Sequence, residues 1–141
     1  MPADPLVDIM ALQDLLHQVV APWVRQIELR VLEARAGEVA LALPITAPHV
    51  HGGGVLCGQT MMAAADTAMI LAIVSQTGGF KPMTTVQLQT SFLRPVGGNS
   101  GAARVVARVL RMGRSLVFGE VQVINADDEL AAHATTTYAL L

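Results

Sequence analysis

The chain has 141 residues, about the length of one domain, so we expect a single domain spanning residues 1–141. Charged residues make up only 14% and the net charge is -2, which argues against nucleic-acid binding and favours an oligomer that covers apolar surface. A single cysteine excludes an internal disulfide, and the N-terminus carries acidic residues where a signal peptide carries basic ones, so we expect a cytoplasmic protein.

The first elements are a helix and a pair of strands. Apolar residues recur at helical spacing over residues 5–20, which predicts an amphipathic N-terminal helix. Alternating apolar residues then predict strands over residues 27–33 and 38–44, and the Ala-Gly pair at 36–37 is typical of a hairpin turn.

A long apolar segment follows a loop that carries two histidines and three consecutive glycines. Residues 55–74 are long enough to cross a bilayer, but Asp66 lies in the middle, and a carboxylate is expensive in lipid. We therefore expect no membrane association but a helix over residues 58–76, apolar all round and buried in protein, that ends at the glycines 78 and 79.

The rest of the chain alternates as antiparallel strands do. The four expected strands cover residues 85–93, 103–109, 116–124 and 130–138. One buried helix among six strands predicts an α+β hotdog fold, in which an antiparallel six-stranded sheet wraps around the long central helix.

Asp66 is the most informative residue, because almost all of its neighbours in the sequence are apolar. A buried carboxylate is costly unless it is paired or hydrogen-bonded, so such residues tend to be functional. A structural alternative is a carboxylate satisfied by a backbone amide or by an arginine across a subunit interface.

The glycines before the helix indicate a second functional feature. Gly53 and Gly54 let the backbone approach another molecule closely, and Gly58 falls where the helix should begin. Free N–H groups at a helix N-terminus can stabilise the oxyanion that develops from a thioester carbonyl. The alternative is that these glycines only turn the chain.

The segment from Gly53 to Ala68, GGVLCGQTMMAAADTA, resembles the PaaI-like hotdog thioesterases. Those proteins carry an Asn, then His-Gly-Gly, then a helix with Leu-Ala-Asp-Thr-Ala. Further segments resemble the family in the same order, and the match runs from about residue 37 to the end. These are Thr84-Thr85-Val86, Phe92-Leu93-Arg94-Pro95, Gly113-Arg114 and Ala134-Thr135-Thr136-Thr137-Tyr138.

The resemblance implies an acyl-CoA thioesterase that acts on an aromatic or a short- to medium-chain acyl group. Asp66 would be the nucleophile or general base, and the Gly58 amide would form the oxyanion hole. Thr84 or Thr85, entering from a neighbouring subunit, would position water at an active site on the interface of a homodimer or homotetramer.

Two positions depart from the family pattern. Counting back from Asp66, the family asparagine is replaced by His51 and the family histidine by Cys57. His51 can still act as a donor or a proton carrier, or be a solvent-facing loop residue. Cys57 is more typical of a small packed residue than of a nucleophile.

We also expect residues that contact the substrate. Met62 and Phe92 are candidates for the acyl pocket, and three arginines near strand ends could meet CoA phosphates or simply be solvated. The full substrate or CoA-binding set is Gly53, Gly54, Cys57, Met62, Phe92, Arg94, Arg111 and Arg114.

Other chemistries have weaker support in the sequence. No Gly-x-Ser-x-Gly is present, and His49-x-His51 with Asp66 is a poor metal motif, so we expect no metal and no cofactor beyond the CoA of the substrate. A hotdog hydratase or dehydratase, which pairs a histidine with a carboxylate, and a non-catalytic acyl-CoA-binding protein stay open as alternatives.

Overall fold

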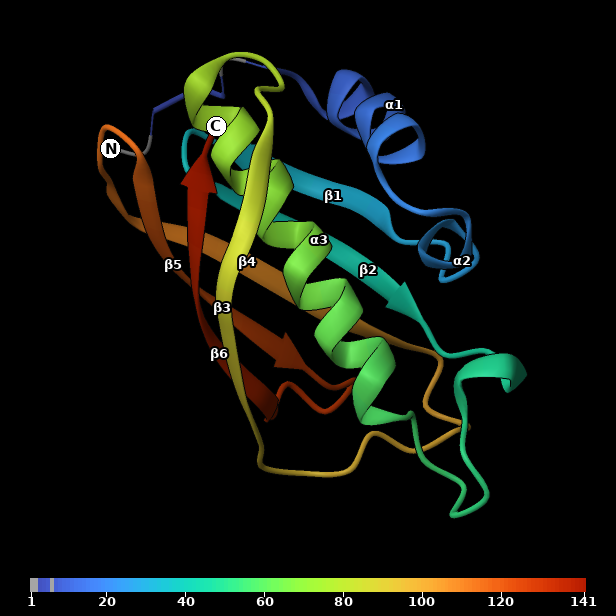
Figure 1. The fold of residues 1–141 in the computed structure, drawn as a ribbon. Coiled ribbons are helices and arrows are strands. Elements are labelled where there is room, and N and C mark those ends of the chain that lie inside the picture. The colour runs from blue at the N-terminus through green and yellow to red at the C-terminus, as the bar shows by residue number, and fades with distance from the viewer. Residues whose placement is uncertain (1–2, 6) are drawn as a thin grey trace.

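The computed structural model describes residues 3–5 and 7–141, and its elements form a curved sheet with one long helix against its inner face (Figure 1). Helix α1 (Ile9–Val19) begins later than predicted, because the Asp8 side chain accepts a hydrogen bond from the Ala11 amide at 2.8 Å and caps the helix there. Leu6, which belonged to the predicted helix, lies outside the described residues. A short helix α2 (Pro22–Arg25) that the sequence did not predict follows.

The sheet has six antiparallel strands in the order β1-β2-β4-β5-β6-β3, so β1 and β3 form its two edges. The predicted strands are all present. Most of their ends are shifted from the predicted positions, by up to three residues. Their bounds are β1 Arg30–Arg35, β2 Glu38–Pro44, β3 Met83–Phe92, β4 Ala102–Met112, β5 Leu116–Ile124 and β6 Leu130–Leu140. The hotdog architecture predicted from the element order is confirmed.

Helix α3 (Gly58–Thr77) forms the centre of the core and ends, as predicted, at Gly78, whose φ of 90° requires a residue without a side chain. The helix is long and apolar enough to cross a membrane, but 67% of that window is buried inside the fold. Its apolar residues pack against β2, β4 and β5.

One stripe of α3 is only partly covered by other elements of the chain. Residues at helical spacing along this stripe are half-buried or exposed, although most of the rest of the helix is buried. The stripe consists of Gln59, Met62, Ala63, Asp66 and Ile70. It runs beside the edge strand β3, so the helix stripe and the sheet edge form one surface without a partner in the chain (Figure 1).

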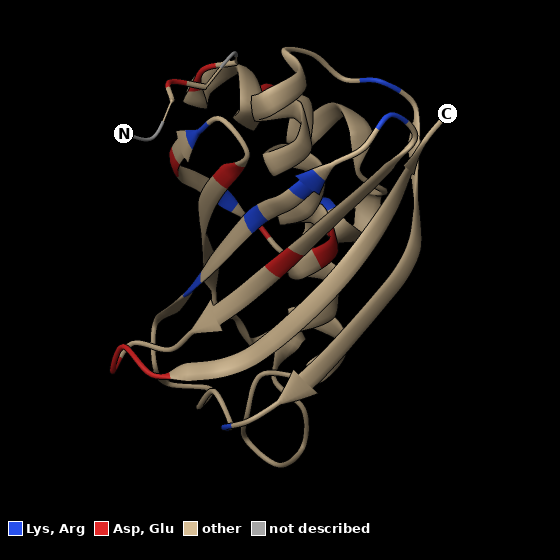
Figure 2. Cartoon of the chain, turned by 90° about the vertical axis from the view of Figure 1, so that its left-hand side faces the viewer, with Lys and Arg blue, Asp and Glu red and all other residues tan. Residues whose placement is uncertain are grey.

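The outer face of the sheet carries most of its charges as a cross-strand row (Figure 2). Arg108 donates to Glu38 at 2.8 Å and lies 3.6 Å from Glu120, whose other oxygen lies 3.2 Å from His133. Exposed pairs of this kind add little stability. The edge strand β3 contains no charged residue at all, and it is uniformly uncharged in Figure 2.

Candidate active site

Asp66 lies in the middle of α3, half-buried, and two hydroxyl groups hold one of its carboxylate oxygens. Thr85 donates to Oδ1 at 2.8 Å, and the Tyr138 hydroxyl donates to the same atom. The Tyr138 hydroxyl also donates to the Asp66 carbonyl oxygen at 2.9 Å. No hydrogen bond from the described residues reaches Oδ2, which keeps contact with solvent. The carboxylate is thus fixed through one oxygen and available through the other.

A β-bulge in β3 aims Thr85 at the carboxylate. Thr85 pairs with Tyr138 and Gln87 with Thr137, so Val86 is the extra residue. Val86 is 60% exposed although simple strand alternation would put it on the same face as Leu88, because the bulge shifts the alternation by one residue. Thr85 and Leu88 therefore face the helix.

The position of Thr85 corrects one expectation. The resemblance implied that the threonine enters from a neighbouring subunit, but Thr85 reaches Asp66 within one chain. Thr84 is exposed and makes no side-chain hydrogen bond among the described residues. Of the two candidates, the structure brings Thr85 to the carboxylate.

Tyr138 is a partner of Asp66 that the sequence did not indicate. Its side chain is 1% exposed, on the inner face of β6. Burial raises the pKa of the Tyr138 phenol far above its usual value, and the Asp66 charge and the hydrogen bond to it raise the pKa further. The phenol therefore stays protonated and always donates.

The N-terminus of α3 has unoccupied backbone amides, as predicted for Gly58. Cys57 is the N-cap residue, but its side chain makes no capping hydrogen bond to the first turn. Within the described chain, the N–H groups of Gly58, Gln59 and Thr60 have no recorded acceptor. These amides and the positive end of the helix dipole can bind an oxyanion.

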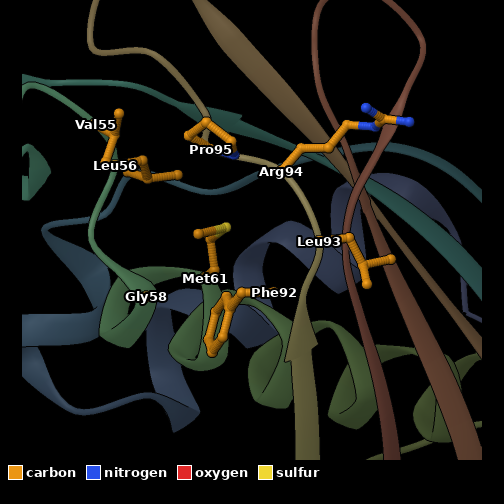
Figure 3. A pocket seen from close by; sticks show the side chains of 8 residues that line it. All are labelled: Val55, Leu56, Gly58, Met61, Phe92, Leu93, Arg94 and Pro95. Atoms are coloured by element: carbon orange, nitrogen blue, oxygen red, sulfur yellow. The ribbon is translucent and has the colours of Figure 1, made fainter.

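A pocket of about 280 Å³ opens at this helix end (Figure 3). The Phe92 ring packs on Gly58 so closely that a Cβ at position 58 would lie 3.1 Å from its Cζ atom. Met61 points into the pocket, whereas the predicted Met62 lies on the uncovered stripe near Asp66. The lining residues are Val55, Leu56, Gly58, Met61, Phe92, Leu93, Arg94 and Pro95.

The glycine loop is shaped by its own contacts. His51 is exposed, and its Nδ1 accepts a hydrogen bond from the Gly53 amide at 2.8 Å. A neutral ring with Nδ1 as acceptor carries its proton on Nε2, so His51 presents a donor to the outside. Gly54, with φ of 83°, accepts from the Gly98 amide at 2.9 Å and joins this loop to the one before β4.

The three arginines do not converge within one chain. Arg94 borders the pocket and lies 3.7 Å from Glu129. Arg111 and Arg114 belong to the end of β4 and the turn after it. That end of the sheet lies beside the C-terminal half of α3, because Gly37 accepts a hydrogen bond from the Val109 amide and donates one to the Ser75 hydroxyl there.

Within one chain the two candidate catalytic groups lie far apart. Gly58 and Asp66 are eight residues apart in a continuous helix, which is about 12 Å along its axis. On the inner face of β3, between the level of Gly58 and the level of Asp66, the Thr90 hydroxyl is buried and has no hydrogen-bond partner among the described residues. Among residues 3–5 and 7–141, no group of three or more His, Cys, Asp or Glu side chains is arranged to hold a metal.

Comparisons with known proteins agree with the fold. A Thermoplasma volcanium protein named "Putative esterase TV1331" is 29% identical over 106 residues, which are 75% of this chain and 77% of that protein. The structure of conserved protein PA5202 from Pseudomonas aeruginosa has a TM-score of 0.80 at 29% identity, over 89% of this chain and 98% of that one. The E. coli PaaI protein has a TM-score of 0.78 at 18% identity, over 92% and 91% of the two chains.

These relatives place the chain in the hotdog-fold class of proteins, and the resemblance to PaaI-like proteins is confirmed. The model of the thioesterase superfamily matches residues 48–132, more than half of the sequence, from the loop before α3 into β6. The chain belongs to the thioesterase superfamily.

Proposed function

We propose that the protein hydrolyses acyl-CoA thioesters, with Asp66 as the catalytic carboxylate. The observation that carries this proposal is the asymmetric environment of the carboxylate. Two hydroxyl donors on Oδ1 fix its orientation, and Oδ2 is left for a water molecule or for the substrate carbonyl. A general base must be oriented before it can remove a proton from attacking water.

In this mechanism Oδ2 accepts a proton as the water oxygen forms a bond to the thioester carbon. The carbonyl oxygen becomes an oxyanion, and the unoccupied amide of Gly58 stabilises it. Collapse of the intermediate breaks the C–S bond, and the CoA sulfur leaves with a proton returned by the carboxyl group. Direct attack by Oδ2 to form an anhydride, which water then cleaves, uses the same groups.

The separation of Gly58 and Asp66 supports an active site shared by two subunits. At about 12 Å along one helix, the two groups cannot act on one carbonyl, so the Gly58 amide must meet the Asp66 of a second chain. The uncovered stripe of α3 and the uncharged edge of β3 offer the surface for that contact, because an unpaired strand edge is a template for another strand. We propose a homodimer as the smallest active unit, and a cytoplasmic protein.

The pocket beside Gly58 supports binding of the thioester region. Its lining is mostly apolar, with Phe92 and Met61 as adaptable walls and Arg94 at the rim, where a guanidinium can meet a CoA phosphate. We propose a short- to medium-chain or aromatic acyl group as the substrate class.

Thiol release from a panel of acyl-CoAs, measured for wild type and Asp66→Asn, tests this function. We expect turnover by wild type on at least one substrate and a loss of about 100-fold or more in the folded variant. Binding of acyl-CoAs without thiol release from any of them would identify a binding protein instead. Hydration of crotonyl-CoA without hydrolysis would identify a hydratase.

A further inference from the structure

The loop that leads into α3 is attached to the first turn of that helix by His49. The His49 carbonyl oxygen accepts a hydrogen bond from the Cys57 amide at 2.8 Å. The His49 ring Nδ1 lies 3.0 Å from the Thr60 hydroxyl, and Cys57 Sγ lies 3.0 Å from the same hydroxyl. We call these three contacts the His49 clamp. Thr60 is 3% exposed, whereas His49 and Cys57 are half-buried, so the clamp is partly shielded from water.

The clamp forms a hydrogen-bond chain. A threonine hydroxyl has one proton to donate and can accept others. If the Cys57 thiol donates to the Thr60 oxygen and the Thr60 hydroxyl donates to Nδ1 of His49, both of these hydrogens have an acceptor. A chain of satisfied hydrogen bonds rigidifies the groups it joins.

The clamp takes the place of an ordinary helix cap. Most helices begin with a side chain that accepts from the amides of the first turn, and this arrangement occupies those amides. Here the side chain of the N-cap residue Cys57 bonds to the Thr60 hydroxyl instead, so the amides of Gln59 and Thr60 that a cap would occupy stay free beside that of Gly58. The helix start is therefore held without use of the donors that a ligand needs.

His51, the histidine expected at the site, has no such link to the helix. Its ring accepts from Gly53 and shapes only its own turn. His49 is two residues earlier in the sequence but contacts the helix through both its ring and its carbonyl group.

We propose that His49, acting through Thr60, is the positioning residue that holds the Gly58 amide in place to stabilise the oxyanion. This role rests on the proposed thioesterase function. It predicts that loss of the hydroxyl link moves the helix start relative to the substrate, and small displacements of a catalytic donor can lower turnover by up to about 100-fold.

The test compares variants that remove the link with variants that keep it. Thr60→Val has nearly the same shape without the hydroxyl, and Thr60→Ser keeps the hydroxyl. His49→Leu removes the ring nitrogen, and His49→Asn keeps a polar atom near the Nδ1 position. His17→Leu, on the exposed face of α1, is the matched histidine control.

We expect Thr60→Val and His49→Leu to lower kcat by about tenfold or more with KM changed less than about threefold. Thr60→Ser and His49→Asn should recover most of the lost turnover, and His17→Leu should match wild type. If Thr60→Val retains wild-type kcat, or if Thr60→Ser loses as much as Thr60→Val, the positioning role is overturned, even where Asp66→Asn confirms the hydrolase.

Hydrogen exchange at the Cys57 amide gives a readout that does not depend on turnover. Exchange should be faster by about tenfold in Thr60→Val than in wild type, with an unchanged unfolding midpoint. If hydrogen exchange at the Cys57 amide is the same in Thr60→Val as in wild type, the proposed role of the His49 clamp is overturned. An absence of thiol release in wild type overturns the proposed function and with it the catalytic role of the clamp, and this result is distinct from a failure of the exchange experiment.

Discussion

The Tyr138 hydroxyl donates a hydrogen bond to Oδ1 of Asp66 across 72 residues of sequence. The bond joins the inner face of β6 to the middle of α3, and Thr85 completes the set of donors to the same oxygen. Two residues of the sheet therefore set the orientation of a carboxylate that lies on the helix.

Removal of the phenol hydroxyl should weaken catalysis through the orientation of Asp66. We predict that Tyr138→Phe lowers kcat by about tenfold with little change in KM, because the substrate does not contact the phenol in this mechanism. Thr85→Val should act in the same direction. Steady-state kinetics on the best acyl-CoA measures both, and wild-type kcat in Tyr138→Phe would remove the phenol from the mechanism.

The raised pKa of Tyr138 predicts an unusual alkaline titration. The unfolded chain ionises near the ordinary value of 10.0, whereas the folded protein keeps the phenol protonated. The stabilisation is thus complete below pH 10 and is lost as the pH rises above it, with a slope of up to about 1.4 kcal/mol per pH unit.

Tyrosinate absorbance can test this directly, because Tyr138 is the single tyrosine of the sequence. We expect no tyrosinate signal from the folded protein as the pH passes 10, and its appearance together with unfolding. Urea unfolding of Tyr138→Phe should lack the alkaline loss of stability. Ionisation of the folded wild type near pH 10 would contradict the buried, carboxylate-bonded phenol.

The contact between Gly58 and Phe92 predicts the effect of one added methyl group. In Gly58→Ala the new Cβ would lie 3.1 Å from Phe92 Cζ, so the half-exposed ring must move toward the pocket. We predict a loss of turnover of about 100-fold from the disturbed oxyanion amide. Gly79→Ala is the matched control, since a Cβ there meets no atom within 4 Å.

Phe92→Leu in the Gly58→Ala background should recover part of this loss, because the smaller side chain relieves the contact. A Gly58→Ala variant with wild-type turnover would show that this amide is not part of the catalytic site. Circular dichroism of each variant separates this result from a failure to fold.

A site shared between subunits predicts complementation. When Asp66→Asn and Gly58→Ala chains assemble together, a mixed dimer combines one intact Gly58 with one intact Asp66 in one of its two sites. Random assembly should then restore about a quarter of wild-type turnover, although each variant alone is nearly inactive. A mixture of Asp66→Asn with the Asp66→Asn, Gly58→Ala double variant should stay inactive. No recovery in the first mixture would place both groups in one chain.

The sequence predicted the secondary-structure elements well, because they leave local patterns. Six alternating strands, one apolar helix and Gly78 at its end are all visible over short windows. Asp66 stood out because it interrupts an apolar helix.

The partners of Asp66 were harder to predict, since they depend on register and on contacts far apart in sequence. The bulge at Val86 exchanges the faces of Val86 and Thr85, and no alternation rule places a bulge. Tyr138 appeared only as part of a family signature, and nothing local linked its hydroxyl to a residue 72 positions earlier. The short spacing between His49 and His51 likewise concealed that only His49 contacts the helix.

The uncharged edge of β3 also bears on the fate of a chain that has folded but not yet assembled. Natural sheets protect a free edge with lysine, proline or a short strand, and the ten residues of Met83–Phe92 contain neither lysine nor proline. The bulge at Val86 interrupts only the beginning of the strand. A chain that lacks its partner, because of dilution or slow synthesis, therefore exposes this strand edge, and any extended segment can pair with it. Such incorrect association competes with correct pairing. For the proposed homodimer, solubility would be a property of the assembled unit, so conditions that dissociate it should produce aggregates rather than stable monomers.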